Sequence, residues 1–186
     1  MRSIVSTLNS KGFSQICNSF EEVLDFIHNV KHQDHCILIF QNDDVRDTIA
    51  KEFVNSKYSR NMVTACFAHN PTKYNCNHEI TYDKLVQKQK FKPEVISDFL
   101  STVLDKPYSP DSTRIVCEDT ACLSEAGFFE EHQKYGNNMN KKVINDSTIL
   151  CCYNSSKLDK EKIDVVLSSR KYVILDEPFS VYEKIN

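Results

Sequence analysis

The residues best suited to chemistry in this sequence are two adjacent acids, Glu118 and Asp119, which directly follow the apolar run 115–117. A hydrophobic run that ends abruptly in acids is typical of a buried strand of a parallel sheet. In open α/β sheets, ligands bind just outside the carboxyl ends of the strands. The stretch therefore predicts a site where Glu118 accepts hydrogen bonds from a ligand or holds a structural basic partner.

Polar and aromatic side chains follow several other apolar runs that we expect to be parallel strands. They are Gln41, Asn42, His69, Tyr82, Tyr153 and Asn154. Because parallel strands present their carboxyl ends at one edge of a sheet, these side chains and the two acids are predicted to line one ligand-binding rim. Hydrogen-bonding groups and aromatic faces beside an apolar sheet suit a small-molecule pocket. Polar residues also accumulate at strand ends for structural reasons, and both interpretations stay open.

The turn after the first predicted strand reads QNDD over residues 41–44. It has no glycine to let backbone amides approach a phosphate, and no Lys–Ser/Thr pair to hold phosphate and magnesium. Its two acids would repel phosphate. The turn therefore disfavours an ordinary P-loop NTPase. With only 3 glycines in the chain, we expect no cofactor that depends on a glycine-rich loop.

A cluster of cysteine and histidine has the pattern C-x2-H…C-x-H, formed by Cys66, His69, Cys76 and His78. Zinc accepts such ligands. However, Cys66 falls inside a predicted strand, and the C-x-H spacing is tighter than structural zinc sites use. We predict no metal here and leave the cluster as an alternative. A thiol redox sensor is the other alternative, although no C-x-x-C motif supports it.

Catalytic nucleophiles are present without a base fixed near them by sequence. Ser124 and Cys122 are the candidates, and Ser124 is better interpreted as the N-cap of a helix. His35 begins the first predicted strand, where a capping hydrogen bond is a better interpretation than a ligand contact. We therefore expect no enzyme activity.

Hydrophobic periodicity predicts an α/β fold. The expected strands cover residues 35–40, 61–67, 80–82, 115–117, 148–153, 172–175 and 179–182, and the last of these is expected at a sheet edge. The expected helices cover residues 19–30, 45–53, 93–103, 124–135 and 159–167. This alternation predicts a mostly parallel central sheet with helices on both faces.

Composition limits the function classes. Hydrophobic residues make up 40% of the 186 residues and the net charge is −3, with basic residues scattered, so nothing favours a nucleic acid as partner. We interpret the basic run 84–92 as a solvated turn, with an anion-binding patch as the alternative. No apolar run is long enough for a membrane span or a secretory signal. Several of the eight cysteines lie in apolar runs, which favours reduced thiols and the cytoplasm.

The order of segments resembles the MEDS domain, the sensory domain named from methanogens, methylotrophs and the DcmR regulator of bacteria and archaea. The matching blocks are HCILIFQNDD, TYDKLVQKQKFKPEVISDFL, CEDTACL with FFEEHQKYGNNM, and TILCCYNSSKLDKEKIDVVLSSRKYVI with EPF. The resemblance implies a degenerate RecA- or KaiC-like fold without a working P-loop. It divides the chain into an N-terminal helical extension, residues 1–33, and a sensory domain, residues 34–186.

The resemblance also implies a function. A non-catalytic sensory domain would bind a small, partly apolar ligand and signal to a partner protein, such as a histidine kinase or a transcription regulator. Two alternatives stay open. One is a degenerate nucleotide- or divalent-metal-binding protein of RecA or KaiC type that uses Glu118 and Asp119. The other is a protein-interaction module that forms a homodimer through the N-terminal helix.

Overall fold

The computed structural model describes residues 2–31, 34–55, 63–104, 113–118, 123, 126–137, 147–168 and 170–185. Its elements are, in chain order, α1 Arg2–Ser10, β1 Phe13–Cys17, α2 Phe20–Asn29, β2 His35–Phe40, α3 Asp43–Val54, β3 Val63–Ala68, η2 Pro71–Tyr74, β4 His78–Thr81, α4 Tyr82–Leu85, β5 Val86–Gln87, β6 Lys90–Phe91, α5 Pro93–Leu104, β7 Thr113–Cys117, α7 Phe129–Asn137, β8 Thr148–Asn154, η4 Ser155–Lys157, α9 Lys160–Ser168, β9 Tyr172–Asp176 and β10 Phe179–Lys184.

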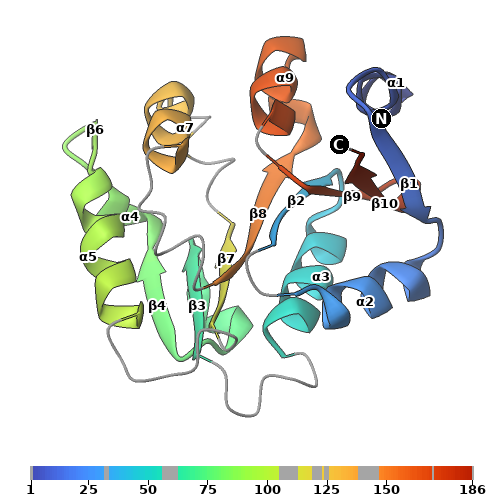
Figure 1. The fold of residues 1–186 in the computed structure, drawn as a ribbon. Helices are drawn as coiled ribbons and strands as arrows, with labels where there is room; N and C mark the ends of the chain where they lie inside the picture. Colours follow the sequence, from blue (N-terminus) through green and yellow to red (C-terminus); the bar gives the residue numbers. More distant parts are fainter. Residues whose placement is uncertain are drawn as a thin grey trace.

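A single large sheet organises the described chain (Figure 1). Its strand order is β1-β10-β9-β2-β8-β7-β3-β4, and every neighbouring pair from β9 to β4 is parallel. The pairs β9–β10 and β10–β1 are antiparallel. Strands β2, β3, β7 and β8 are buried along almost their whole length, as their apolar runs predict. The topology confirms the predicted fold class, a mostly parallel α/β sheet.

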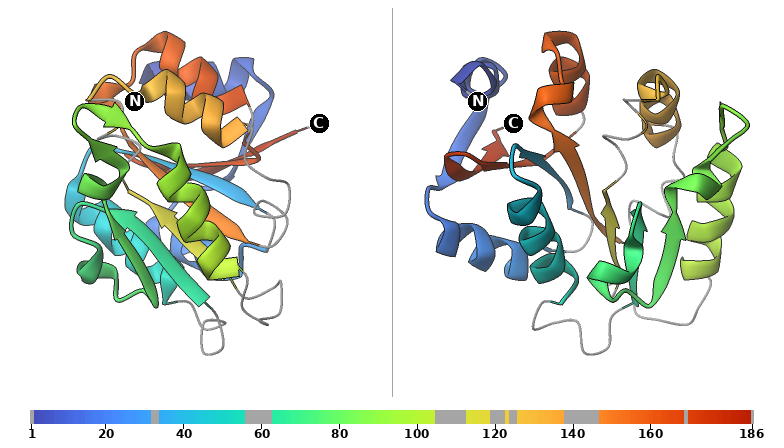
Figure 2. Two further views of the ribbon diagram at one scale, coloured as in Figure 1. Left: turned by 90° about the vertical axis from the view of Figure 1, so that its left-hand side faces the viewer. Right: turned by 180° about the vertical axis from the view of Figure 1, so that it is seen from behind.

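Helices cover both faces of the sheet, also as predicted (Figure 2). Helices α1, α5, α7 and α9 share one hydrophobic core with one set of strand side chains. Helices α2 and α3 share a second core with the alternate side chains of the same strands. In β2, for example, Ile37 and Ile39 face the first core while Leu38 and Phe40 face the second. We call these the α7 face and the α3 face.

Side-chain caps fix where the helices begin. The Ser19 hydroxyl accepts a hydrogen bond from the Glu22 backbone amide at 3.2 Å, which confirms the expected start of α2. Likewise, the Asp159 carboxylate accepts from the Lys162 amide at 2.9 Å at the start of α9. Each cap satisfies one amide that the helix itself leaves without a partner.

The N-terminal segment, which the sequence analysis expects to be a helical extension, also contains a strand. Residues before 18 form α1 and β1, and β1 pairs with β10. The prediction that residues 179–182 form an edge strand is therefore wrong, because β10 lies between β1 and β9. Ile4 and Leu8 of α1 are buried in the core of the α7 face. The segment predicted as a helical extension thus contains a sheet strand as well as two helices.

A buried arginine connects the helices of the α3 face to the sheet. Arg114 of β7 is 2% exposed, and its guanidinium donates to the carbonyl oxygens of Ile27 at 2.9 Å and Phe53 at 2.8 Å. It also donates to those of His28 and Val30, each at 3.3 Å. These carbonyls lie at the C-terminal ends of α2 and α3, where helix dipoles favour a cation. Burial lowers the pKa of Arg114 to about 10.

None of the described helices is both long enough and apolar enough to cross a membrane.

Candidate functional site

Glu118, the acid that the sequence analysis ranks first, lies at the carboxyl end of β7 at the rim of the sheet. Its backbone amide donates to the Phe67 carbonyl oxygen at 2.9 Å, which continues the pairing with β3. The residue is only 6% exposed. Burial of a carboxylate at this depth requires a charge partner or hydrogen bonds. The adjacent Asp119 lies outside the described residues, so its predicted role stays a prediction.

Two basic side chains supply the partners of Glu118. Its Oε1 accepts from Lys73 Nζ at 2.7 Å and lies 3.2 Å from an Arg46 terminal nitrogen. Arg46 also binds Asp47 Oδ1 through Nε at 2.8 Å, and Lys73 binds the same oxygen at 2.9 Å. The Tyr74 hydroxyl donates to Asp47 Oδ1 at 3.1 Å. We call these residues, Arg46, Asp47, Lys73, Tyr74 and Glu118, the ion cluster.

The positive and negative charges within the ion cluster balance each other. Although burial works in the opposite direction, hydrogen bonds from Lys73 and Arg46 lower the pKa of Asp47. Burial likewise opposes the shift at Arg46, whose pKa is raised by the charge of Glu118 and the hydrogen bond to Asp47. Two cations thus face two carboxylates. Among the described residues, Glu118 Oε2 is buried without a hydrogen-bond partner.

The backbone amides of the turn that follows β2 are hydrogen-bonded to a carboxylate of the same protein. Asp176, at the end of β9 and 5% exposed, accepts hydrogen bonds through Oδ2 from the backbone amides of Gln41 at 2.7 Å and Asn42 at 2.9 Å. Amides at such a strand-to-helix turn are the donors that bind phosphate in P-loop proteins. Here, the Asp176 carboxylate of the same protein accepts the hydrogen bonds of these amides in place of a phosphate.

The other predicted rim residues serve the fold or form a separate contact. Asn42 caps α3 and Asn154 caps η4. Tyr153 is 1% exposed, and its hydroxyl accepts from Gln133 Nε2 at 3.0 Å in the core of the α7 face. His69 and Tyr82 do come together, with ring centroids 4.9 Å apart. The described members of the predicted rim thus make separate contacts, and the cavity described next is lined by other residues.

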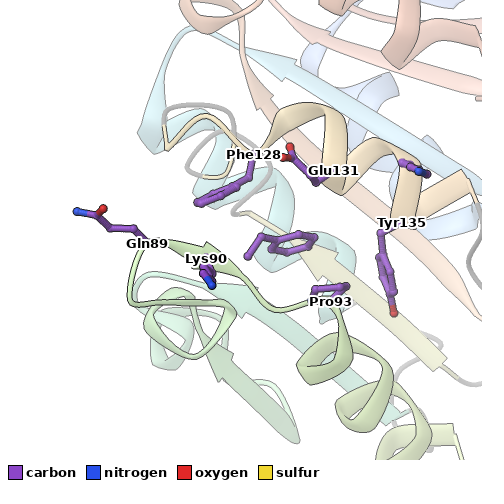
Figure 3. Close-up of a pocket in the computed structure, with 8 residues that line it drawn as sticks. Gln89, Lys90, Pro93, Phe128, Glu131 and Tyr135 are labelled. Atoms are coloured by element: carbon purple, nitrogen blue, oxygen red, sulfur yellow. The ribbon is translucent and has the colours of Figure 1, made fainter.

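A cavity of about 580 Å³ lies elsewhere at this edge, between the β5–β6 hairpin, the start of α5 and helix α7 (Figure 3). We call it the aromatic pocket. Its lining residues are Gln89, Lys90, Phe91, Pro93, Phe128, Glu131, Lys134 and Tyr135. The segments that form it follow β4 and β7, so it lies on connections from the carboxyl ends of the strands. Its volume falls within the range of small-molecule sites.

Phe91 is the centre of the aromatic contacts in this pocket. Its ring stacks on Phe128 at 6.2 Å and meets the edges of His132 at 6.1 Å and Tyr135 at 6.5 Å. The Tyr135 hydroxyl lies 2.8 Å from the Ser97 hydroxyl, which connects α7 to α5 across the pocket. The interpretation of residues 84–92 as a solvated turn is therefore incomplete, because the run carries a ring that contacts α7.

The hairpin that positions Phe91 has an unusual turn. Lys88 and Gln89 both adopt the left-handed conformation, with φ of 50° and 57°. Type I′ hairpins require such angles at both central positions, and glycine or asparagine normally fills them. A lysine and a glutamine there cost conformational energy, and such strain is often found at functional sites. The sequence carries no Asn-Gly signal that would have predicted this turn.

A second cavity, of about 790 Å³, lies between α7 and α9. Its lining is dominated by charged side chains, among them Glu130, Lys134, Asp159, Glu161 and Lys162. It contains one aromatic ring, that of Phe129. A site for a partly apolar molecule needs apolar walls with a few polar groups, which the aromatic pocket provides better.

The cysteine and histidine cluster does not assemble into a metal site. Cys66 and Cys76 are hydrogen-bonded to each other, while the His69 ring packs against Tyr82. Over the described ranges, no three His, Cys, Asp or Glu side chains are grouped so as to hold a metal ion. His35 makes a hydrogen bond, as expected, but its Nε2 lies 3.2 Å from the Cys151 sulfur instead of capping a strand.

Known proteins show only remote similarity to this chain. No protein family matches the sequence, and no curated protein does. Among solved structures, flagellar accessory protein FlaH from Methanocaldococcus jannaschii aligns with 13% identity and a TM-score of 0.47, over 88% of this chain and 80% of that one. The AAA domain of FIGL-1 in complex with ADP aligns with 13% identity and a TM-score of 0.49, over 94% of this chain and 61% of that one.

Neither similarity is close enough to transfer a site or an activity to this chain. The resemblance to the MEDS family, which no comparison matches, stays a prediction from the sequence.

Proposed function

We propose that this protein is a non-catalytic sensory domain that binds a small, partly apolar ligand in the aromatic pocket. The observation that carries the proposal is the contact set of Phe91, which joins rings from the hairpin and α7 around a cavity of about 580 Å³. Aromatic walls supply most of the binding energy in such sites, and a few polar groups supply orientation.

The charges at the pocket suggest the ligand class. Lys90 and Lys134 both line the cavity and are exposed, and Glu131 is the acid among the lining residues. Two ammonium groups beside stacked rings favour a planar molecule with one acidic group, such as an aromatic carboxylate. Because the ammonium groups are exposed, we expect them to contribute less to affinity than the rings.

A pair of matched probes tests this proposal. We expect 2-naphthoate to bind the full chain more tightly than the uncharged 2-naphthol, as measured by ligand-observed NMR and calorimetry. Phe91→Ala should weaken 2-naphthoate binding by about tenfold or more, since an aromatic anchor is lost. The matched control is Phe20→Ala, which removes a half-buried ring that contacts Phe179 instead. Equal weakening by both variants, or no binding of either probe, would contradict the proposal.

Signalling requires that occupancy changes a surface that a partner can contact. Gln89, one of the two residues of the strained turn, lines the pocket, so a ligand that contacts the hairpin would change its mobility. We expect hydrogen exchange in the hairpin to slow when 2-naphthoate binds. A histidine kinase or a transcription regulator would then bind the changed surface, as the MEDS resemblance implies.

The alternative, a degenerate nucleotide- or divalent-metal-binding protein, has one observation in its favour. Glu118 Oε2 is buried and, within the described chain, has no hydrogen-bond partner, so it could accept a ligand. Two others weigh against it: Asp176 occupies the amides of Gln41 and Asn42, and Arg46 and Lys73 hold Glu118 Oε1. Calorimetry with ATP and Mg²⁺ should give no binding heat. Binding that Glu118→Gln abolishes would favour the alternative.

A further inference from the structure

Two cysteines on neighbouring strands form a thiol pair that the proposed function does not use. Cys117 ends β7, and Cys151 lies opposite it in register on the parallel strand β8. Both side chains pack in the core of the α7 face, and their thiols are hydrogen-bonded to each other. Neighbouring strands lie about 4.8 Å apart, which is within the Cα range that a disulfide spans. Both sulfurs can therefore be joined without a change of register.

Basic groups surround this pair. His35 Nε2 lies 3.2 Å from the Cys151 sulfur. The hydrogen bond from Cys117 lowers the pKa of Cys151 well below its ordinary 9.0, against the effect of burial, and the positive charges of His35 and Arg170 act in the same direction as Cys117. Thiolates react with oxidants whereas thiols do not. An electropositive setting is what distinguishes reactive cysteines from inert buried ones.

We propose that Cys117 and Cys151 are a site of reversible oxidation by hydroperoxides, at which a disulfide joins β7 to β8. Cys151 is 6% exposed, whereas Cys117 is half-buried and accessible from solvent. The Cys117 thiol donates its hydrogen bond to Cys151, so the negative charge resides on Cys151 and Cys117 is the accessible partner thiol.

The chemistry balances with a hydroperoxide as the oxidant. The Cys151 thiolate attacks one peroxide oxygen and the O–O bond breaks. Cys151 becomes a sulfenic acid, and the leaving oxygen takes the proton of the Cys117 thiol and departs as water or an alcohol. The resulting Cys117 thiolate then attacks the Cys151 sulfur and the S–O bond breaks. The hydroxide that leaves takes a proton from solvent to form water. Overall, two thiols lose two electrons and two protons, and the peroxide gains them. A dithiol reductant reverses the step.

A second thiol pair in the same protein provides an internal control. Cys66 and Cys76 are also hydrogen-bonded to each other. However, Cys66 has Glu79 as its register partner on β4, and the charges nearest to it are the acids Glu79 and Glu118. Hydrogen bonds from Cys66 and Thr64 lower the pKa of Cys76, but burial and the acid Glu79 oppose that shift. In contrast, the charges of His35 and Arg170 assist the shift in the pKa of Cys151. We therefore expect the Cys117–Cys151 pair to oxidise first.

The test treats the full chain with hydrogen peroxide, alkylates the remaining thiols and measures the intact mass. We expect the loss of two hydrogens and the protection of two of the eight cysteines, both reversed by dithiothreitol. Trypsin leaves Cys117 with Cys122 on one peptide and Cys151 with Cys152 on another. The controls Cys122→Ser and Cys152→Ala should keep the cross-link between these peptides, and Cys117→Ser should abolish it.

The basic neighbour provides a second readout that does not depend on removing a thiol. His35→Gln should slow cross-linking several-fold, because the charge of His35 and its contact with the Cys151 sulfur are among the effects that favour the thiolate. Circular dichroism confirms that each variant folds, and mapping of the wild-type peptides needs no variant at all. No cross-link in the wild type, a first cross-link between Cys66 and Cys76, or a cross-link that survives Cys117→Ser would each overturn the proposal.

Discussion

Polar groups at the carboxyl edge of the sheet lie in different environments on its two faces. On the α3 face, the ion cluster satisfies its charges internally, and Asp176 occupies the amides of the first strand-to-helix turn. On the α7 face, the aromatic pocket leaves Lys90, Lys134 and Glu131 at an open cavity. Groups that already have partners contribute to stability, whereas groups beside an open cavity are available to a ligand. We therefore expect mutations on the α3 face to change stability and mutations in the pocket to change binding.

The largest expected effect tests the α3 face at Glu118. Glu118→Ala removes the carboxylate shared by Arg46 and Lys73, and should lower the free energy of unfolding by about 3 kcal/mol in urea denaturation. Breaking a buried ion pair is costly because the remaining charges lose their partner.

The control for Glu118→Ala is Asp43→Ala, which removes an exposed carboxylate that binds the same Arg46. Its effect should stay under about 1 kcal/mol. If the two variants lost equal stability, the ion cluster would not be the stabilising feature that its geometry indicates.

The next largest effect concerns the turn after β2, whose amides bind Asp176. Asp176→Ala leaves the amides of Gln41 and Asn42 without their acceptor and should cost about 2 kcal/mol. Inorganic phosphate should restore part of this loss in the variant, because two free amides at a helix start attract an anion. Thermal denaturation with and without phosphate measures both effects. Phosphate stabilisation of the wild type by the same amount would show that Asp176 does not block the turn.

The strands and their direction could be predicted from sequence because each apolar run is local. Residues 35–40 form β2 as expected, and the acid after the central strand does lie at the rim. The partners of that acid could not be predicted. Arg46 and Lys73 come from α3 and η2, far from Glu118 in the chain, and only the packed sheet brings them together.

The aromatic pocket was missed for a related reason. Phe91 lies in a short hairpin and Phe128 precedes α7, and neither segment has a period that marks its rings as partners. Strand β1 was missed because its sequence, FSQIC, is only partly apolar and its pairing partner, β10, is near the other end of the chain. Local patterns identify elements, whereas pockets and edge pairings depend on contacts between distant segments.

The pH dependence of stability should separate the two faces. Burial lowers the pKa of His132 on the α7 face below its ordinary 6.5, so the unfolded chain binds more protons and stability falls as the pH drops below 6.5. On the α3 face, hydrogen bonds to Asp47, against the effect of burial, lower its pKa below 3.8, and the stability that they provide is lost only as the pH falls below that value.

Urea denaturation between pH 3 and pH 8 measures this dependence, with one variant for each face. His132→Phe should flatten the stability curve in the window below pH 6.5 and leave the acid limb unchanged. Asp47→Asn should flatten the stability curve below pH 3.8 and leave the window between pH 3.8 and pH 6.5 unchanged. A change in the same pH window for both variants would mean that the two faces are not independent.

The smallest expected effect is a gain of stability at the hairpin of the pocket. Replacing Lys88 and Gln89 by Asn and Gly supplies residues that accept left-handed angles, and should raise the free energy of unfolding by about 1 kcal/mol. The same pair of changes should weaken 2-naphthoate binding modestly, since Gln89 lines the pocket. The matched control is Lys84→Asn, on the same basic run but outside the turn, which should change neither quantity. If the variant lost stability instead, the turn conformation would be supported by side-chain contacts of Lys88 or Gln89, and the hairpin would not be the strained wall that the pocket proposal requires.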